Sequence, residues 1–273
     1  AAYLITPAFG DYLRALEAFN ANVIRCPLPT GTSSEMQADF SLASLLAKQF
    51  TKQQASEIQG QQFGLLINNP HNPTGKLFQA DDLLPLLERF ALVVVDEAFM
   101  DFLPPAQQQS LIDRIADFPN LVILRSLTKF YTLAGLRLGY AIAHPDRLNQ
   151  WQQWRDPWSV NVLAVAAAEA VLQDTQFQQQ TWNWLSSARN QLFEGLKSLP
   201  GLHPFPGAAN YLLVQANVST VLLQHRLLKQ SQILIRDCMS FPELGDRFFR
   251  VAVRTANDNE KLIKALATVL TNR

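Results

Sequence analysis

The sequence predicts an α/β protein with a mostly parallel, doubly wound sheet and a smaller C-terminal α+β lobe. Apolar runs that suit buried strands alternate with amphipathic stretches over the first half of the chain. Glycine and proline then cluster at 200–201 and 204–207, before a region of shorter mixed elements. With 273 residues, of which 48% are hydrophobic, the chain is long enough to bury a substantial core.

Short apolar runs predict the strands of the first half, and leucines at helical spacing predict its helices. The expected strands are residues 3–6, 23–27, 63–68, 92–96, 121–126 and 138–143. Helices are expected over 11–20 and 80–90, and the glutamine-rich residues 48–62 are expected to begin helical and end as a surface loop. Because strands and helices alternate, the sheet should be mostly parallel.

From residue 145 the pattern changes to longer helices. They are expected over 146–155, 164–173 and 182–199, the last being long enough to link two lobes. The five tryptophans gather in this region, where we expect them to pack rather than to bind a ligand. The small lobe should contain elements at 210–215, 218–229, 233–236, 248–253 and 257–270. The predicted domains are therefore a large domain over 1–155, a helical linker region over 156–200 and a small domain over 201–273.

Composition excludes several classes of partner. Basic and acidic residues are balanced at 23 each, which gives no electrostatic case for nucleic acid or an anionic membrane. The four histidines lack metal-ligand spacing, and the two cysteines lie far apart in sequence, which suits a reducing compartment. No run of eighteen apolar residues occurs. We therefore expect a cytoplasmic protein without a metal.

The segment S-L-T-K at 126–129 follows an apolar strand run and holds a lysine between hydroxyls and a later arginine. A lysine at the end of a buried strand should be poorly solvated, which makes its amine more easily neutral and nucleophilic. Ser126, Thr128 and Arg137 could hold a dianionic phosphate beside Lys129. The alternative is a surface turn with a solvated lysine and an arginine in a surface ion pair.

Two further segments follow predicted strands. N-P-H-N-P-T-G at 69–75 presents Asn72 between two prolines that restrict the backbone, although an ordinary turn has the same composition. D-E-A-F at 96–99 places Asp96 at the carboxyl end of a strand, where open α/β sheets bind ligands. A helix N-cap is the alternative role for this aspartate.

In this order, and with G-L-R-L-G at 135–139, these segments resemble the class I/II aminotransferase superfamily of fold-type I pyridoxal phosphate enzymes. The resemblance extends over the whole chain. It implies that Lys129 bonds covalently to pyridoxal 5'-phosphate, that Asp96 pairs with the pyridine nitrogen, and that Asn72 binds the phenolic oxygen. It assigns the cofactor's phosphate and ring face to the following residues: Ser126, Thr128 and Arg137 for the phosphate, and Phe9 for stacking on the ring.

The chain departs from the family at Phe99, where many aminotransferases carry a tyrosine whose hydroxyl donates to the same phenolic oxygen as Asn72. The change puts ordinary transamination in question, or it is a tolerated swap of similar volume. A second departure is the start of the chain, where residues 1–6 suggest a strand already inside a domain. The resemblance implies that a phosphate-binding loop and an arm precede it, so we expect an N-terminally truncated fragment.

Two arginines of the predicted small lobe point to the substrate. The resemblance makes Arg250 the partner of a substrate α-carboxylate and Arg236 the partner of a phosphate, as in histidinol-phosphate aminotransferases. Without the resemblance, each is equally well explained as a surface ion-pair residue. The segments 96–102, 125–131, 157–161 and 247–254 look more like the threonine-phosphate decarboxylases of cobalamin biosynthesis, in which Asn161 would lie near the substrate.

We therefore predict decarboxylation of L-threonine O-3-phosphate to aminopropanol phosphate. The alternatives are amino transfer from histidinol phosphate to 2-oxoglutarate and a non-catalytic scaffold of the same fold. The expected partner is a phosphorylated amino acid or amine, and the resemblance implies a homodimer for the full-length protein.

Overall fold

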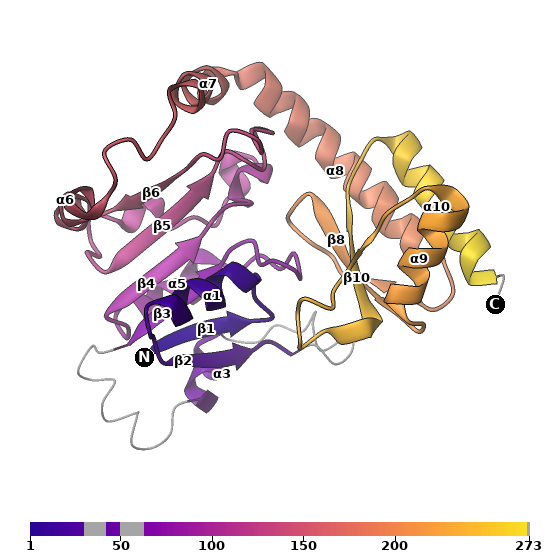
Figure 1. The fold of residues 1–273 in the computed structure, drawn as a ribbon, viewed down its shortest axis with the longest axis horizontal. Helices are drawn as coiled ribbons and strands as arrows, with labels where there is room; N and C mark the ends of the chain where they lie inside the picture. The colour runs from indigo at the N-terminus through magenta and orange to yellow at the C-terminus, as the bar shows by residue number, and fades with distance from the viewer. Residues whose placement is uncertain (30–41, 50–62, 272–273) are drawn as a thin grey trace.

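Two sheets organise the chain in the computed structural model, which describes residues 1–29, 42–49 and 63–271 (Figure 1). The strands of the larger sheet are β1 (Ala2–Thr6), β2 (Val23–Pro27), β3 (Gly64–Asn68), β4 (Leu92–Asp96), β5 (Leu121–Ser126) and β6 (Gly139–Ala143). Those of the smaller sheet are β7 (Leu202–Pro204), β8 (Tyr211–Ala216), β9 (Arg236–Asp237) and β10 (Phe248–Ala252). Their spatial orders are β2-β1-β3-β4-β5-β6 and β7-β8-β10-β9.

The larger sheet is parallel except at one edge. β1 to β5 pair in parallel, and β6 pairs antiparallel with β5. The register places Asn68 beside Asp96 and Asp96 beside Leu124. The carboxyl ends of β3, β4 and β5 therefore meet at one edge, where ligands of open α/β sheets bind.

The described residues also form a set of α-helices. They are α1 (Gly10–Ala18), α3 (Leu42–Gln49), α5 (Ala80–Leu87), α6 (Pro145–Trp154), α7 (Val162–Gln173), α8 (Thr175–Lys197), α9 (Thr220–Ser231) and α10 (Ala256–Thr271). The predicted start of α8 at residue 182 is wrong, because Asp174 caps the helix by accepting a hydrogen bond from the amide of Phe177 at 2.9 Å. The loop expected to follow α3 falls on residues 50–62, outside the described part of the chain.

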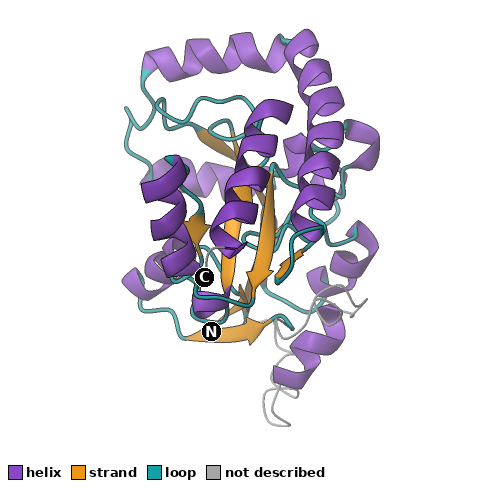
Figure 2. Cartoon of the chain, turned by 90° about the vertical axis from the view of Figure 1, so that its right-hand side faces the viewer, coloured by secondary structure: helices purple, strands orange, loops and turns teal. Residues whose placement is uncertain are grey.

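The two sheets are joined by an apolar cluster beside α8. Phe99 and Phe130 from the larger lobe pack with Leu185 and Leu192 of α8 and with Tyr211 of β8. In Figure 1, α9 and α10 lie on the same side of the small sheet as α8, and their buried residues belong to the same cluster. Figure 2, seen from that side, shows helices in front of strands. The cluster therefore fixes the small sheet at the edge where the strands of the large sheet end. The domain boundaries at 155 and 200 stay predictions.

The tryptophans divide into packed and exposed residues. Trp182 stacks on Phe130 with ring centroids 5.9 Å apart, as the packing hypothesis expects. Trp154 and Trp158 are 71% and 88% exposed, so the packing prediction is wrong for them in this chain. Both cysteines are buried free thiols. None of the helices in the described residues is long and apolar enough to cross a membrane.

Candidate active site

A cleft of about 670 Å³ lies where the larger sheet meets the small lobe. It is bordered by residues at or after the carboxyl ends of β1, β3, β4 and β5 and by residues of β9 and β10. Nine of the ten predicted site residues line it: Phe9, Asn72, Asp96, Ser126, Thr128, Lys129, Arg137, Arg236 and Arg250. The fold thus brings together side chains that lie up to 241 positions apart (9 to 250) in the sequence. The role of each residue stays a prediction.

Asp96 ends β4 and offers both carboxylate oxygens to donors. Its Oδ1 accepts from the amide of Ala98 at 2.9 Å, and its Oδ2 accepts from the hydroxyl of Tyr12. Burial raises the pKa of Asp96, while the Tyr12 and Ala98 hydrogen bonds and the charge of Lys129 lower it. A cationic partner in the cleft would act in the same direction as Lys129 and favour the ionised carboxylate.

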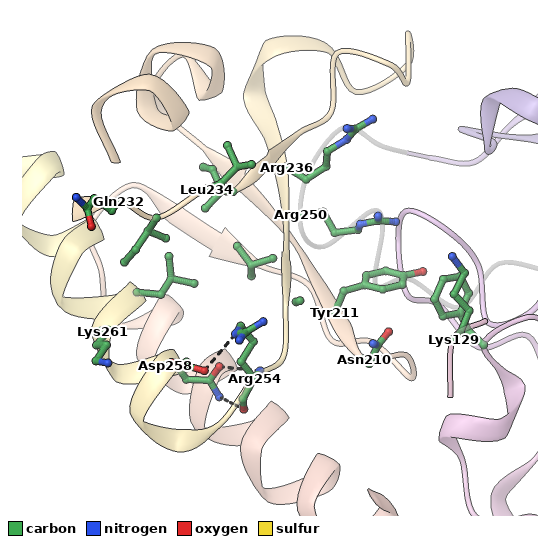
Figure 3. A pocket seen from close by; sticks show the side chains of 17 residues that line it. Lys129, Asn210, Tyr211, Gln232, Leu234, Arg236, Arg250, Arg254, Asp258 and Lys261 are labelled. Carbon is green, nitrogen blue, oxygen red and sulfur yellow. Dashed lines mark hydrogen bonds and ion pairs between the residues drawn. The ribbon is translucent and has the colours of Figure 1, made fainter. Parts of the chain in front are cut away.

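Lys129 stands three residues beyond β5 and projects into the cleft. Its Nζ lies 5.7 Å from the centroid of the Phe99 ring. The expectation of a poorly solvated lysine is wrong for this structure, because the side chain is exposed within the open cleft. In Figure 3, Lys129 lies across the pocket from Arg250 of the small lobe, with the ring of Tyr211 between their backbones. The charge of Lys129 lowers the pKa of Asp96, and its side chain lines the same cleft as Arg236 and Arg250 of the small lobe.

The predicted phosphate ligands border the same cleft. The hydroxyls of Ser126 and Thr128 lie 2.7 Å apart and bond to each other. Arg137 has a φ of +55°, a conformation that is costly for a residue with a side chain, and its guanidinium donates to the carbonyl of Ala134 at 2.9 Å. The glycine at 139 is also required, because a Cβ there would lie 2.7 Å from the carbonyl oxygen of Arg125.

Asn72 is held by both lobes. Its backbone N–H donates to Oδ1 of Asn68 at 2.6 Å, and its side-chain Oδ1 accepts from the guanidinium of Arg250. The loop ends at Gly75, which has a φ of +76° and approaches Gly207 so closely that a Cβ would lie 3.0 Å from its Cα. The asparagine is therefore fixed in direction, as the two prolines predict.

The two arginines occupy opposite positions on adjacent antiparallel strands, since Arg250 of β10 pairs with Arg236 of β9. The guanidinium carbon of Arg250 lies 4.6 Å from the centroid of the Tyr211 ring, while Arg236 is exposed. A second cavity of about 610 Å³ shares both arginines and Lys129 and continues along the small sheet toward Arg254 (Figure 3). Like charges directly opposite each other are unfavourable without an anion between them.

Asn161 is the one predicted residue that does not line the cleft. Its Oδ1 accepts from the amide of Ala164 at 2.8 Å and caps α7, and its Nδ2 donates to the carbonyl of Leu136 at 3.3 Å. Contact between Asn161 and a substrate stays a prediction.

Sequence reasoning missed the role of Tyr12. This residue lies three positions after Phe9, at the start of α1, and its ring packs edge-on against Phe9 with centroids 5.8 Å apart. The sequence pattern that could have predicted it is a tyrosine three positions after Phe9, since residues three apart share one face of a helix. Phe99 fills the place of the expected tyrosine and packs edge-on against Tyr211 at 5.2 Å.

The chemistry of this set fits pyridoxal phosphate. The cleft supplies a carboxylate for a protonated pyridine nitrogen, an amine for an aldehyde, and an amide for a phenolic oxygen. Two hydroxyls and a guanidinium suit a dianionic phosphate. Within the described residues, no group of three or more histidines, cysteines or carboxylates is arranged to hold a metal ion.

A mostly parallel α/β sheet with a lysine and a carboxylate at its strand ends defines a class of cofactor-dependent enzymes. The family described as aminotransferase class I and II matches residues 1–266, and the chain belongs to this family. Its members depend on pyridoxal phosphate. The family assignment made from the sequence motifs is thereby confirmed.

Known proteins similar to the chain include enzymes of two kinds. It is 38% identical to a threonine-phosphate decarboxylase of Salmonella typhimurium over 99% of its own length and 71% of that protein's. It is 36% identical to histidinol-phosphate aminotransferase 2 of Nitrosospira multiformis over 76% of the chain and 52% of that protein. The solved histidinol-phosphate aminotransferase of Clostridium acetobutylicum matches with a TM-score of 0.84 and 26% identity, covering 100% of the chain and 78% of that structure. The predicted fold class is confirmed.

Proposed function

We propose that the protein containing this chain uses pyridoxal phosphate to decarboxylate L-threonine O-3-phosphate, releasing carbon dioxide and aminopropanol phosphate. The observation that carries the proposal is the cross-strand pair of Arg236 and Arg250 facing the cleft that holds Lys129. Two opposed guanidinium groups suit a substrate with two anionic groups, and threonine phosphate has a carboxylate and a phosphate.

Bound pyridoxal phosphate supplies an electron sink for the bond that breaks at the substrate's Cα. Asp96 holds a proton at the pyridine nitrogen, since a carboxylate beside that nitrogen favours its charged form. Arg250 binds the substrate's carboxylate, and its contacts with Asn72 and Tyr211 fix its direction. Arg236 binds the phosphate, and the exposed amine of Lys129 delivers a proton to the carbon that loses carbon dioxide.

Phe99 supports decarboxylation over amino transfer. A tyrosine hydroxyl at this position would donate to the same oxygen as Asn72, and Phe99 instead presents an apolar ring 5.7 Å from Nζ of Lys129. The similarity to the Salmonella decarboxylase over 99% of the chain supports the same choice.

The second candidate is amino transfer from histidinol phosphate to 2-oxoglutarate. It is supported by the similarity to the Clostridium enzyme and by the same arginine pair, because histidinol phosphate also carries a phosphate. Histidinol phosphate has no carboxylate, so this reaction would leave Arg250 for the dicarboxylic acceptor.

Two incubations of the pyridoxal phosphate-loaded protein separate the candidates. We expect carbon dioxide release from threonine phosphate and no 2-oxoglutarate-dependent formation of glutamate from histidinol phosphate. Glutamate formation without carbon dioxide release would overturn the proposal in favour of the second candidate. A Lys129→Ala variant is the control, since it should abolish the visible absorbance of the bound cofactor, whereas a wild-type protein that never takes up the cofactor would indicate a non-catalytic scaffold.

A further inference from the structure

A cluster of three charged residues lies behind the strand ends that form the cleft. Glu97 follows Asp96 directly, and Arg125 precedes Ser126 directly. Successive residues of an extended chain point to opposite sides. Asp96 and Ser126 line the cleft, and Arg125, which also borders it, directs its buried guanidinium to Glu97. Oε2 of Glu97 and the guanidinium nitrogen of Arg125 are 2.8 Å apart, and both side chains are almost fully buried.

Asp101 completes the cluster and connects it to α8. Its Oδ1 contacts the guanidinium of Arg125, and its side chain is 14% exposed. Its backbone carbonyl accepts from the indole nitrogen of Trp182 at 2.8 Å. The cluster therefore joins β4, β5, the turn after β4 and the helix that packs against the small lobe.

The charges and the hydrogen bonds of the cluster do not balance if all three groups are ionised. One guanidinium faces two carboxylates, so the net charge would be negative in a site with little water. Oε1 of Glu97, Oδ2 of Asp101 and Nε of Arg125 are buried and have no hydrogen-bond partner within the described residues. A buried charge that is not fully paired is costly. A proton kept on one of the two carboxyl groups makes that group neutral and leaves one carboxylate for one guanidinium.

Glu97 is the carboxyl group best placed to keep that proton. Ser110 donates to its Oε2 at 2.8 Å, the same oxygen that faces Arg125, which leaves Oε1 free to carry a hydrogen. Burial raises the pKa of Glu97 to about 7, against the opposing effects of Arg125, of the Ser110 hydroxyl and of the backbone amide of Leu111. The other titratable groups that act on the cluster are Tyr131 and Tyr140, and burial raises the pKa of both phenols.

We propose that Glu97, Arg125 and Asp101 act as one positioning unit, with a single proton retained on the carboxyl pair, that fixes Asp96 and Ser126 from behind. The inference rests on the proposed cofactor site, because these two side chains are its predicted ligands. The three residues do not bind the cofactor themselves. They hold the backbone of β4 and β5 at the positions from which the ligands project.

Arg125→Met tests the positioning role through the affinity for pyridoxal phosphate, measured by absorbance titration. We expect affinity to fall about tenfold or more, since small displacements of supporting groups have effects of this size. The matched control is Arg189→Met, because Arg189 is also partly buried and donates to the carbonyl of Ala209 at 3.2 Å, away from the strand ends. It should lower the melting temperature and leave the affinity unchanged.

Glu97→Gln tests the retained proton without any cofactor. A group with a raised folded-state pKa favours the folded protein at low pH, and this contribution is lost as the pH rises through that pKa. The wild-type melting temperature should therefore fall between about pH 4.5 and about pH 7 more than that of Glu97→Gln, whose amide cannot lose the proton. The glutamine variant should also bind pyridoxal phosphate at the lower pH as the wild type does.

The outcomes separate this inference from the proposed function. If wild-type protein binds pyridoxal phosphate and Arg125→Met binds it equally well, the positioning role is wrong. If Glu97→Gln shows the full wild-type pH dependence of melting, the retained proton is wrong. If the wild type takes up no cofactor, the proposed function fails, and the melting experiment still decides whether the proton is present.

Discussion

The two walls of the cleft differ in how completely their polar groups are satisfied. On the large-lobe wall, both oxygens of Asp96 accept hydrogen bonds, and the hydroxyls of Ser126 and Thr128 bond to each other. On the small-lobe wall, Arg236 is exposed and lies opposite a second arginine. Side chains whose hydrogen bonds are already made are held in position before a ligand binds. Two opposed positive charges are instead neutralised only when an anionic ligand binds between them. We infer that the first wall sets the chemistry and the second selects the substrate.

The largest expected effect is on the large-lobe wall. Replacing Lys129 by alanine should lower the turnover number about a thousandfold or more, because a group that moves the reacting proton contributes this much. The side chain is exposed, so the melting temperature should change little. Measurements of carbon dioxide release and thermal unfolding check the two statements. Full activity in this variant would show that Lys129 does not take part in the reaction.

A smaller effect is expected on the small-lobe wall. Arg236→Gln should lower kcat/KM for the phosphorylated substrate by about ten- to a hundredfold, the range for a lost charge-assisted hydrogen bond. The activity toward the same compound without its phosphate should not change. Arg247→Gln is the matched control, since Arg247 is also exposed, lines neither cavity and donates to the carbonyl of Asn217 at 2.8 Å. Equal losses for both substrates would mean that Arg236 does not recognise the phosphate.

The same contrast explains what the sequence could predict. Asp96, Lys129 and Asn72 each follow an apolar strand within a short motif, so their arrival at one edge follows from a parallel sheet. The contact between Arg250 and Asn72 joins residues 178 positions apart, and no local pattern contains it. The shared role of Glu97 and Arg125 was hidden for the same reason, because each is read locally as an ordinary surface charge. Their burial becomes apparent only from the packing of β4 against β5.

Tyr12→Phe sharpens the contrast from the large-lobe side. The variant keeps the ring and removes the hydroxyl that donates to Asp96, so the pKa of Asp96 should rise further above its usual value. The carboxylate would then become protonated at a higher pH, and cofactor affinity should begin to fall at a higher pH on the acid side. We expect a loss of about fivefold, which corresponds to one ordinary hydrogen bond. A titration with pyridoxal phosphate at several acidic pH values would show whether the pH at which affinity falls is higher in the variant. An unchanged pH would contradict the role of the Tyr12 hydrogen bond in keeping Asp96 ionised.

The smallest effect is expected at Asn161, which belongs to neither wall in this structure. Asn161→Ala removes the cap of α7 and should lower the free energy of unfolding by about 1 kcal/mol. Asn161→Ser keeps a capping oxygen and removes the longer amide, so it separates the two roles. If the residue only caps the helix, serine should restore stability and KM should equal the wild-type value in both variants. A raised KM in the serine variant, at normal stability, would instead support the predicted contact with the substrate and extend the substrate-selecting wall beyond the small lobe.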